Sequence, residues 1–77
     1  SAALYTIQVA ALSSQDAAES LKNDLEKRYR DVTIERFTAA VTLYRVRVGR
    51  LTDLASADSL MKLLRDEKLG PFVVRLN

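Results

Sequence analysis

The sequence of 77 residues contains no cysteine and no histidine, and it has only two glycines and one proline. Without cysteine the chain can form no disulfide and no thiolate metal site, although this leaves the redox compartment undecided. The chain also lacks a glycine-rich phosphate loop, and its carboxylates fall mainly on predicted helix faces or in turns. We therefore expect no enzyme, no metal and no other cofactor.

Long apolar runs and strong net charge are also missing. No stretch approaches the roughly 20 apolar residues that span a bilayer, and the first residues do not resemble a signal peptide. Lys and Arg outnumber Asp and Glu by 12 to 10, a balance too mild to indicate nucleic acid or an anionic membrane surface. The chain starts almost directly on predicted structure, so we expect residues 1–77 to be a single domain excised from a longer protein. Any membrane contact would then come from an anchor outside this sequence.

An internal repeat organises the chain. A shift of 39 positions superposes Leu4 on Leu43, Tyr5 on Tyr44, Val9 on Val48 and Leu25 on Leu64. Repeats of this length indicate a supersecondary unit used twice, and each copy is predicted to form a strand, a helix and a strand.

Alternating side chains predict four strands, at residues 4–10, 32–37, 43–49 and 72–76. The resulting order βαββαβ is the split βαβ pattern, an α+β fold of the ferredoxin type. Two helices would cover one face of a four-stranded antiparallel sheet, and the opposite face would stay open.

Capping signals set the predicted helix ends. Ser13 is expected to cap the first helix and Thr52 the second. The apolar stripe of the second helix is expected to start at Leu54, and Gly70 with Pro71 should end that helix.

The same alternation assigns side chains to the two faces of the sheet. Residues expected to point at the helices are Tyr5, Ile7, Val9, Val46 and Val48. In the second strand Val32, Ile34 and Arg36 alternate with Thr33, Glu35 and Phe37, which leaves its inward side ambiguous; we favour Val32 and Ile34 as inward. Residues expected on the open face are Thr6, Gln8, Leu43, Arg45, Arg47 and Arg75.

The segments IQVAAL at 7–12 and YRVRVG at 44–49 resemble the SPOR domain. Repeats of that family carry a hydrophobic-Gln-hydrophobic-Gly-Ser-aromatic motif and, later, an Arg-Val-hydrophobic-Val-Gly-Pro-aromatic motif. The resemblance covers the whole chain and implies a module of the bacterial periplasm or cell envelope that binds peptidoglycan without catalysis. It further implies a preference for glycan strands stripped of stem peptides, which would target the parent protein to sites of division or wall remodelling.

Carrying the motif over residue by residue gives the candidate site. The first-strand glutamine of the family matches Gln8 and the third-strand arginine matches Arg45, while the serine becomes Ala11 and a position that can be aromatic becomes Leu43. Arginine suits a glycan carboxylate because it donates two charge-assisted hydrogen bonds at once. The full set of candidate ligand-binding residues is Gln8, Arg45, Leu43, Arg47, Thr6, Ala11 and Arg75.

These departures from the motif predict weaker or altered glycan binding. Ala11 lacks the hydroxyl, Leu43 lacks a ring for a sugar to dock on, and Arg50 stands where the motif has proline. A plainer interpretation of Arg45 and Arg47 is that they keep an exposed face soluble and pair with Glu35.

Two other functions stay open. A divergent SPOR-like module could dock another envelope protein, or weakly its own copy, on the open sheet or on the apolar surface around Leu43 and Val73. RNA-recognition motifs share this element order, but they stack bases on aromatic residues of the central strands. The outward positions of the predicted central strands show no such residue, so no nucleic acid is expected.

Overall fold

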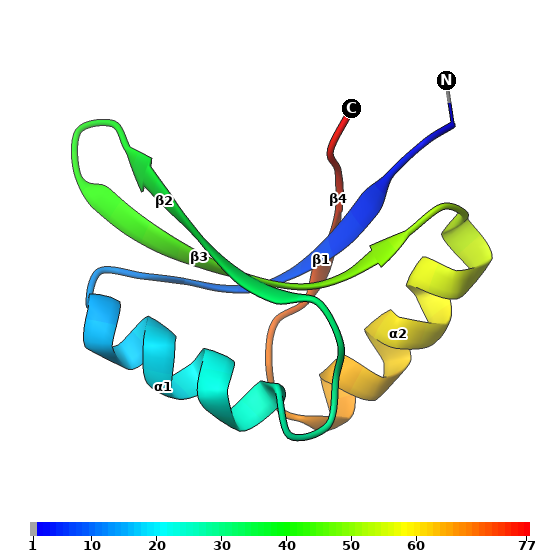
Figure 1. The fold of residues 1–77 in the computed structure, drawn as a ribbon, viewed down its shortest axis with the longest axis horizontal. Helices are drawn as coiled ribbons and strands as arrows, with labels where there is room; N and C mark the ends of the chain where they lie inside the picture. The colour runs from blue at the N-terminus through cyan, green and yellow to red at the C-terminus, as the bar shows by residue number, and fades with distance from the viewer. Residues whose placement is uncertain (1) are drawn as a thin grey trace.

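The computed structural model describes residues 2–77. Along the chain lie β1 (Tyr5–Leu12), α1 (Gln15–Leu25), β2 (Val32–Thr38), β3 (Thr42–Leu51), α2 (Leu54–Asp66) and β4 (Phe72–Arg75) (Figure 1). The predicted α+β class and the βαββαβ order are confirmed.

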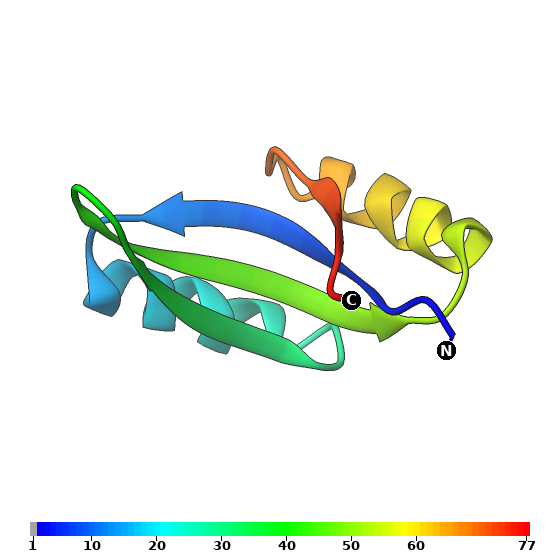
Figure 2. The same ribbon diagram turned by 90° about the horizontal axis from the view of Figure 1, so that it is seen from above.

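The four strands form one antiparallel sheet in the order β2-β3-β1-β4, so β3 and β1 are central. Both helices lie on the same side of this sheet (Figures 1 and 2). α1 packs mainly against β2 and β3, and α2 packs mainly against β1. Within residues 2–77, no helix covers the opposite side.

The core lies between the sheet and the two helices. The largest fully buried side chains come from the central strands and from both helices: Ile7, Val46, Val48, Leu25 and Leu64. Val32 is also buried and Ile34 packs against the core, as predicted for the second strand.

Both helices begin one residue later than the capping signals predicted. The Oγ of Ser14 accepts a hydrogen bond from the backbone N–H three residues on, at 3.1 Å, so Ser14 and not Ser13 is the N-cap of α1. At α2 the cap is Asp53 and not Thr52, and its Oδ1 accepts the corresponding bond at 2.7 Å. Each helix start therefore uses the second of two adjacent polar residues able to satisfy free N–H groups.

The other end of α2 also differs from its prediction. The helix stops at Asp66, and Lys68 adopts the left-handed conformation, with φ +61°, before the chain reaches Gly70. Leu54 is 60% exposed, so the buried stripe of α2 does not begin there; its first buried residue is Ala57.

Glu67 joins the ends of the two helices. It accepts hydrogen bonds from the Arg28 guanidinium, at 2.9 Å to both Nε and Nη2, and from the Tyr29 hydroxyl at 2.7 Å. The bonds from Arg28 and then from Tyr29 hold the pKa of Glu67 below its usual range. Burial and the neighbouring carboxylate raise the pKa of Tyr29.

Candidate functional site

We call the side of the sheet opposite the helices the helix-free face. Strand register arranges its side chains in rows that cross the sheet. The first row is Phe72, Gln8, Arg47 and Thr33. The second is Ala11, Arg45 and Glu35, and the third is Leu43 and Phe37.

A bulge in β1 brings Ala11 onto this face. Gln8 pairs with Arg47 but Ala10 pairs with Val46, so β1 holds one extra residue between these pairs. Strict alternation from Ile7 would have turned Ala11 toward the helices. After the bulge Ala11 instead lies opposite Arg45, on the helix-free face.

A second bulge lies in β3, in the stretch that contains Gly49 and Arg50. Ile7 pairs with Val48 while Tyr5 pairs with Leu51, so β3 holds the extra residue here. Gly49 has a φ of +84°, which glycine adopts without steric cost.

Glu35 is shared between two arginines. Its Oε1 accepts a hydrogen bond from Arg45 Nη1 at 3.1 Å, and its Oε2 accepts one from Arg47 Nη1 at 3.2 Å. The pairing that the plainer interpretation proposed is therefore present. The three groups together carry one net positive charge.

Arg47 and Gln8 form the floor of the site. Arg47 Nε donates to Gln8 Oε1 at 3.2 Å, and both residues are buried, at 9% and 8% exposed. The Gln8 carbonyl is thus engaged, while its NH₂ group forms no hydrogen bond within residues 2–77. Thr6 is also buried, and its hydroxyl donates to the backbone carbonyl of Val48 at 3.1 Å. Of the candidate polar residues on the helix-free face, Arg45 is the most accessible, with its side chain 26% exposed.

Two aromatic rings lie on the helix-free face, where the sequence predicted leucine in place of an aromatic residue. Phe37 is 38% exposed, and the Arg45 guanidinium carbon lies 3.7 Å from its ring centroid, a cation–π contact. Phe72, opposite Gln8, is 52% exposed. Phe37 could have been found from the sequence, because inward Val32 and Ile34 require it to point outward.

The predicted orientation of β4 was wrong, because its side chains alternate in the opposite sense to the prediction. Arg75 pairs with Tyr5, so it lies on the helix side of the sheet and not with Gln8 and Arg45. Val73 likewise pairs with Ile7 and so does not belong to an apolar surface on the helix-free face. Both sides of this edge strand are partly exposed, which is why hydrophobicity alone did not identify its inner side.

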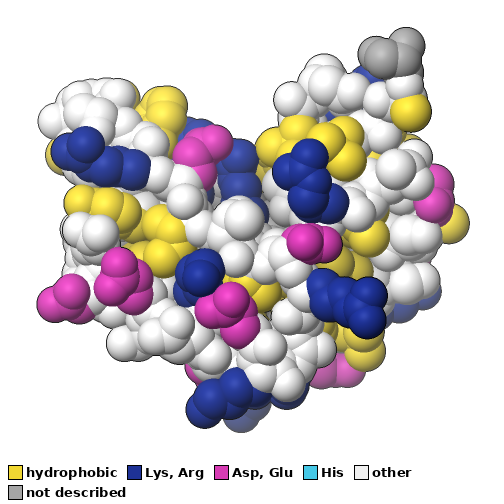
Figure 3. Space-filling view, viewed as in Figure 1, with side chains coloured by type: hydrophobic (Ala, Val, Ile, Leu, Met, Phe, Trp, Pro, Cys, Tyr) yellow, Lys and Arg dark blue, Asp and Glu magenta, His cyan; other side chains and the backbone are white. Residues whose placement is uncertain are grey.

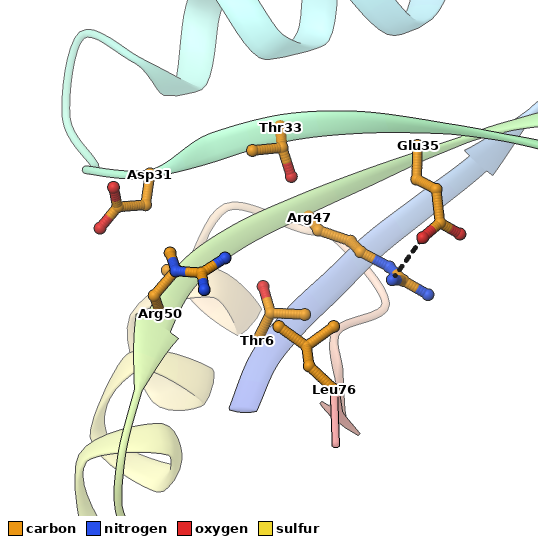
Figure 4. A pocket seen from close by; sticks show the side chains of 8 residues that line it. Thr6, Asp31, Thr33, Glu35, Arg47, Arg50 and Leu76 are labelled. Atoms are coloured by element: carbon orange, nitrogen blue, oxygen red, sulfur yellow. Dashed lines mark hydrogen bonds and ion pairs between the residues drawn. The ribbon is translucent and has the colours of Figure 1, made fainter. Parts of the chain in front are cut away.

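The helix-free face is hollowed. The β2–β3 hairpin rises on one side and the ends of β1 and β4 rise on the other (Figure 1), and Figure 3 shows basic side chains beside an acidic one at the floor between them. A cavity of about 180 Å³ adjoins the Arg47–Glu35 pair, and Thr6, Asp31, Arg50 and other residues line it (Figure 4). Within residues 2–77, Arg50 forms no side-chain hydrogen bond or ion pair.

Two other kinds of site were sought in residues 2–77. No group of three or more acidic, histidine or cysteine side chains there could hold a metal ion. In the same part of the chain, neither helix has the length and hydropathy to cross a membrane.

Comparisons with known proteins place this chain and its fold in a family. The profile of the SPOR domain matches residues 1–75. The crystal structure of the RlpA SPOR domain from Pseudomonas aeruginosa is 31% identical, with a TM-score of 0.81 over 92% of this chain and 97% of that one. The solution structure of the peptidoglycan-binding domain of the B. subtilis cell wall lytic enzyme CwlC shares the fold at 22% identity, with a TM-score of 0.73 over 100% of this chain and 94% of that one. No curated protein gives a significant match. The chain belongs to the SPOR domain family.

Proposed function

We propose that this domain binds peptidoglycan glycan strands, with a preference for strands denuded of stem peptides, through the helix-free face and without catalysis. Family membership supports peptidoglycan as the ligand, as does the fold shared with a peptidoglycan-binding domain. The observation that carries the proposal is the cluster of Arg45, Arg47 and Gln8 beside Phe37 on a hollowed, helix-free surface.

The groups of this cluster match those of a glycan strand. Acetamido and hydroxyl oxygens accept hydrogen bonds, which the unused N–H groups of Arg45 and the NH₂ of Gln8 can donate. Arg45 covers part of the Phe37 ring, and the exposed remainder of this residue, which is 38% exposed, supplies an apolar surface against which a sugar can pack. Removal of a stem peptide leaves a free lactyl carboxylate on each muramic acid, and arginine is suited to bind that carboxylate.

Denudation also changes the shape of the ligand. A strand lying in the hollow of the helix-free face (Figure 3) must fit against both raised sides, and a bare strand has less bulk to place there. We further propose that the parent protein acts in the bacterial periplasm or cell envelope, where this binding would direct it to sites of division or wall remodelling.

Exposed apolar residues at one edge favour a second candidate function, docking of another envelope protein. β4 is an edge strand of four residues; Phe72, its first residue, is 52% exposed, and Leu76, just after it, is 39% exposed. Such apolar exposure is typical of interaction surfaces. RNA is less well supported, because both rings on the helix-free face lie on edge strands.

Co-sedimentation with purified sacculi tests the proposed function. The domain should pellet more strongly with sacculi whose stem peptides an amidase has removed. Arg45→Ala should weaken that binding by about tenfold, the usual cost of a charge-assisted hydrogen bond. Arg65→Ala, which removes an exposed arginine from α2, is the control and should bind like the parent. The proposal would be contradicted if the domain bound neither sacculus preparation, or if both variants lost binding equally. Either result would favour protein partners.

A further inference from the structure

Glu35 lies where a ligand carboxylate would be expected. A carboxylate bound by the arginine pair would place one oxygen near Arg45 and the other near Arg47. Glu35 already makes this arrangement, at 3.1 Å and 3.2 Å. It is not a buried structural group, because its side chain is 48% exposed.

The neighbouring contacts hold both guanidiniums independently of Glu35. Arg47 is also bonded to Gln8, and its side chain is only 10% exposed. Arg45 also lies over the ring of Phe37. Loss of the Glu35 charge should therefore leave the two arginines close to their present positions, with their N–H groups available.

We propose that Glu35 is a specificity-determining residue that competes, inside the protein, with the carboxylates of the ligand. This inference rests on the proposed function and extends it. By bridging Arg45 and Arg47, Glu35 lowers the positive charge of the face and fills the bidentate position, so a lactyl carboxylate must displace it or bind elsewhere. Uncharged acetamido and hydroxyl groups meet no such competitor, because they can accept from the remaining N–H donors. Glu35 thus reduces the advantage of carboxylate-bearing strands over neutral sugar chains.

The test compares two probes of equal length by calorimetric titration of the 77-residue chain. One probe is a denuded muramic acid-containing tetrasaccharide, and the other is a neutral N-acetylglucosamine tetrasaccharide. Glu35→Gln should raise the affinity for the carboxylate-bearing probe by about five- to tenfold and change the affinity for the neutral probe by less than about twofold. High salt should shrink this gain, because it screens charges.

Glu19→Gln is the matched control, since it makes the same change of charge on the exposed surface of α1. It should leave the ratio of the two affinities unchanged. Thermal unfolding of Glu35→Gln establishes that the variant is folded.

Three results would overturn the inference. Equal losses for both probes would make Glu35 a scaffold for the arginines, and unchanged affinities for both probes would show that it does not compete. In either case the parent domain would still bind sacculi, and the proposed function would stand. If the parent chain bound neither probe nor sacculi, the proposed function would fail together with this inference.

Discussion

Gly49→Ala should destabilise the domain by about 1–3 kcal/mol. Gly49 has a φ of +84°, and a Cβ added there would lie 2.7 Å from Leu60 Cδ2. A side chain in the left-handed region costs about 1–2 kcal/mol. Relief of the overlap requires a shift of the half-buried Leu60, and overpacking of this kind commonly costs about 1–3 kcal/mol. Because Leu60 Cδ2 is the end of a flexible side chain, we take the low end of that range.

Urea unfolding followed by circular dichroism measures this loss. For a chain of this size the denaturant slope is about 1 kcal/mol per molar urea, so the midpoint should fall by about 1–3 M. The thermal midpoint should fall by roughly 10 °C.

Gly70→Ala is the matched control within the same chain. A Cβ at Gly70 would meet nothing within 4 Å, and its φ lies outside the left-handed region. Its free energy of unfolding should change by no more than about 0.5 kcal/mol. Equal midpoints for the two variants would refute the reasoning, because they would show that neither the φ of Gly49 nor its approach to Leu60 matters to stability.

The remaining predictions concern the helix start and pH. Ser14→Ala should cost about 1 kcal/mol in urea unfolding because it removes the N-cap of α1, whereas Ser13→Ala should cost little; equal losses would contradict this assignment. The pKa of folded Glu67 lies below its usual value of 4.5, so its stabilising effect is present above that pH and is lost as pH falls through the folded value. The thermal midpoint should therefore decline as the pH falls below 4.5, and it should decline less steeply in Glu67→Gln; parallel declines would exclude Glu67 as a cause.

Much of the fold was readable from periodicity. A strand with one buried and one polar side has apolar and polar residues in alternation. The inward positions of β1 and β3 were therefore predicted correctly, as buried Ile7 and Val46 show. The element order followed from the same pattern together with the capping residues. The exact caps did not follow, because Ser13 and Ser14 are chemically alike and only the path of the chain selects between them.

The candidate site was predictable only in part. Gln8 and Arg45 came from the family motif, and the structure places both on the helix-free face, although a role in binding stays a prediction. Phe37 was missed because both sides of β2 mix apolar and charged residues, so its alternation does not clearly mark an outward side. Arg75 was misplaced because an edge strand that is exposed on both sides gives hydrophobicity no preferred face.

By itself the sequence determined the α+β class, the order of elements, the buried side of the central strands and the resemblance to the SPOR family, because each depends on local periodicity or short motifs. Tertiary structure alone decided three further features: the bulge that turns Ala11 outward, the register that gives β4 its orientation, and the sharing of Glu35 between Arg45 and Arg47. All three depend on which residues stand opposite one another on neighbouring strands. That pairing is set by packing across the whole sheet, which no local segment encodes.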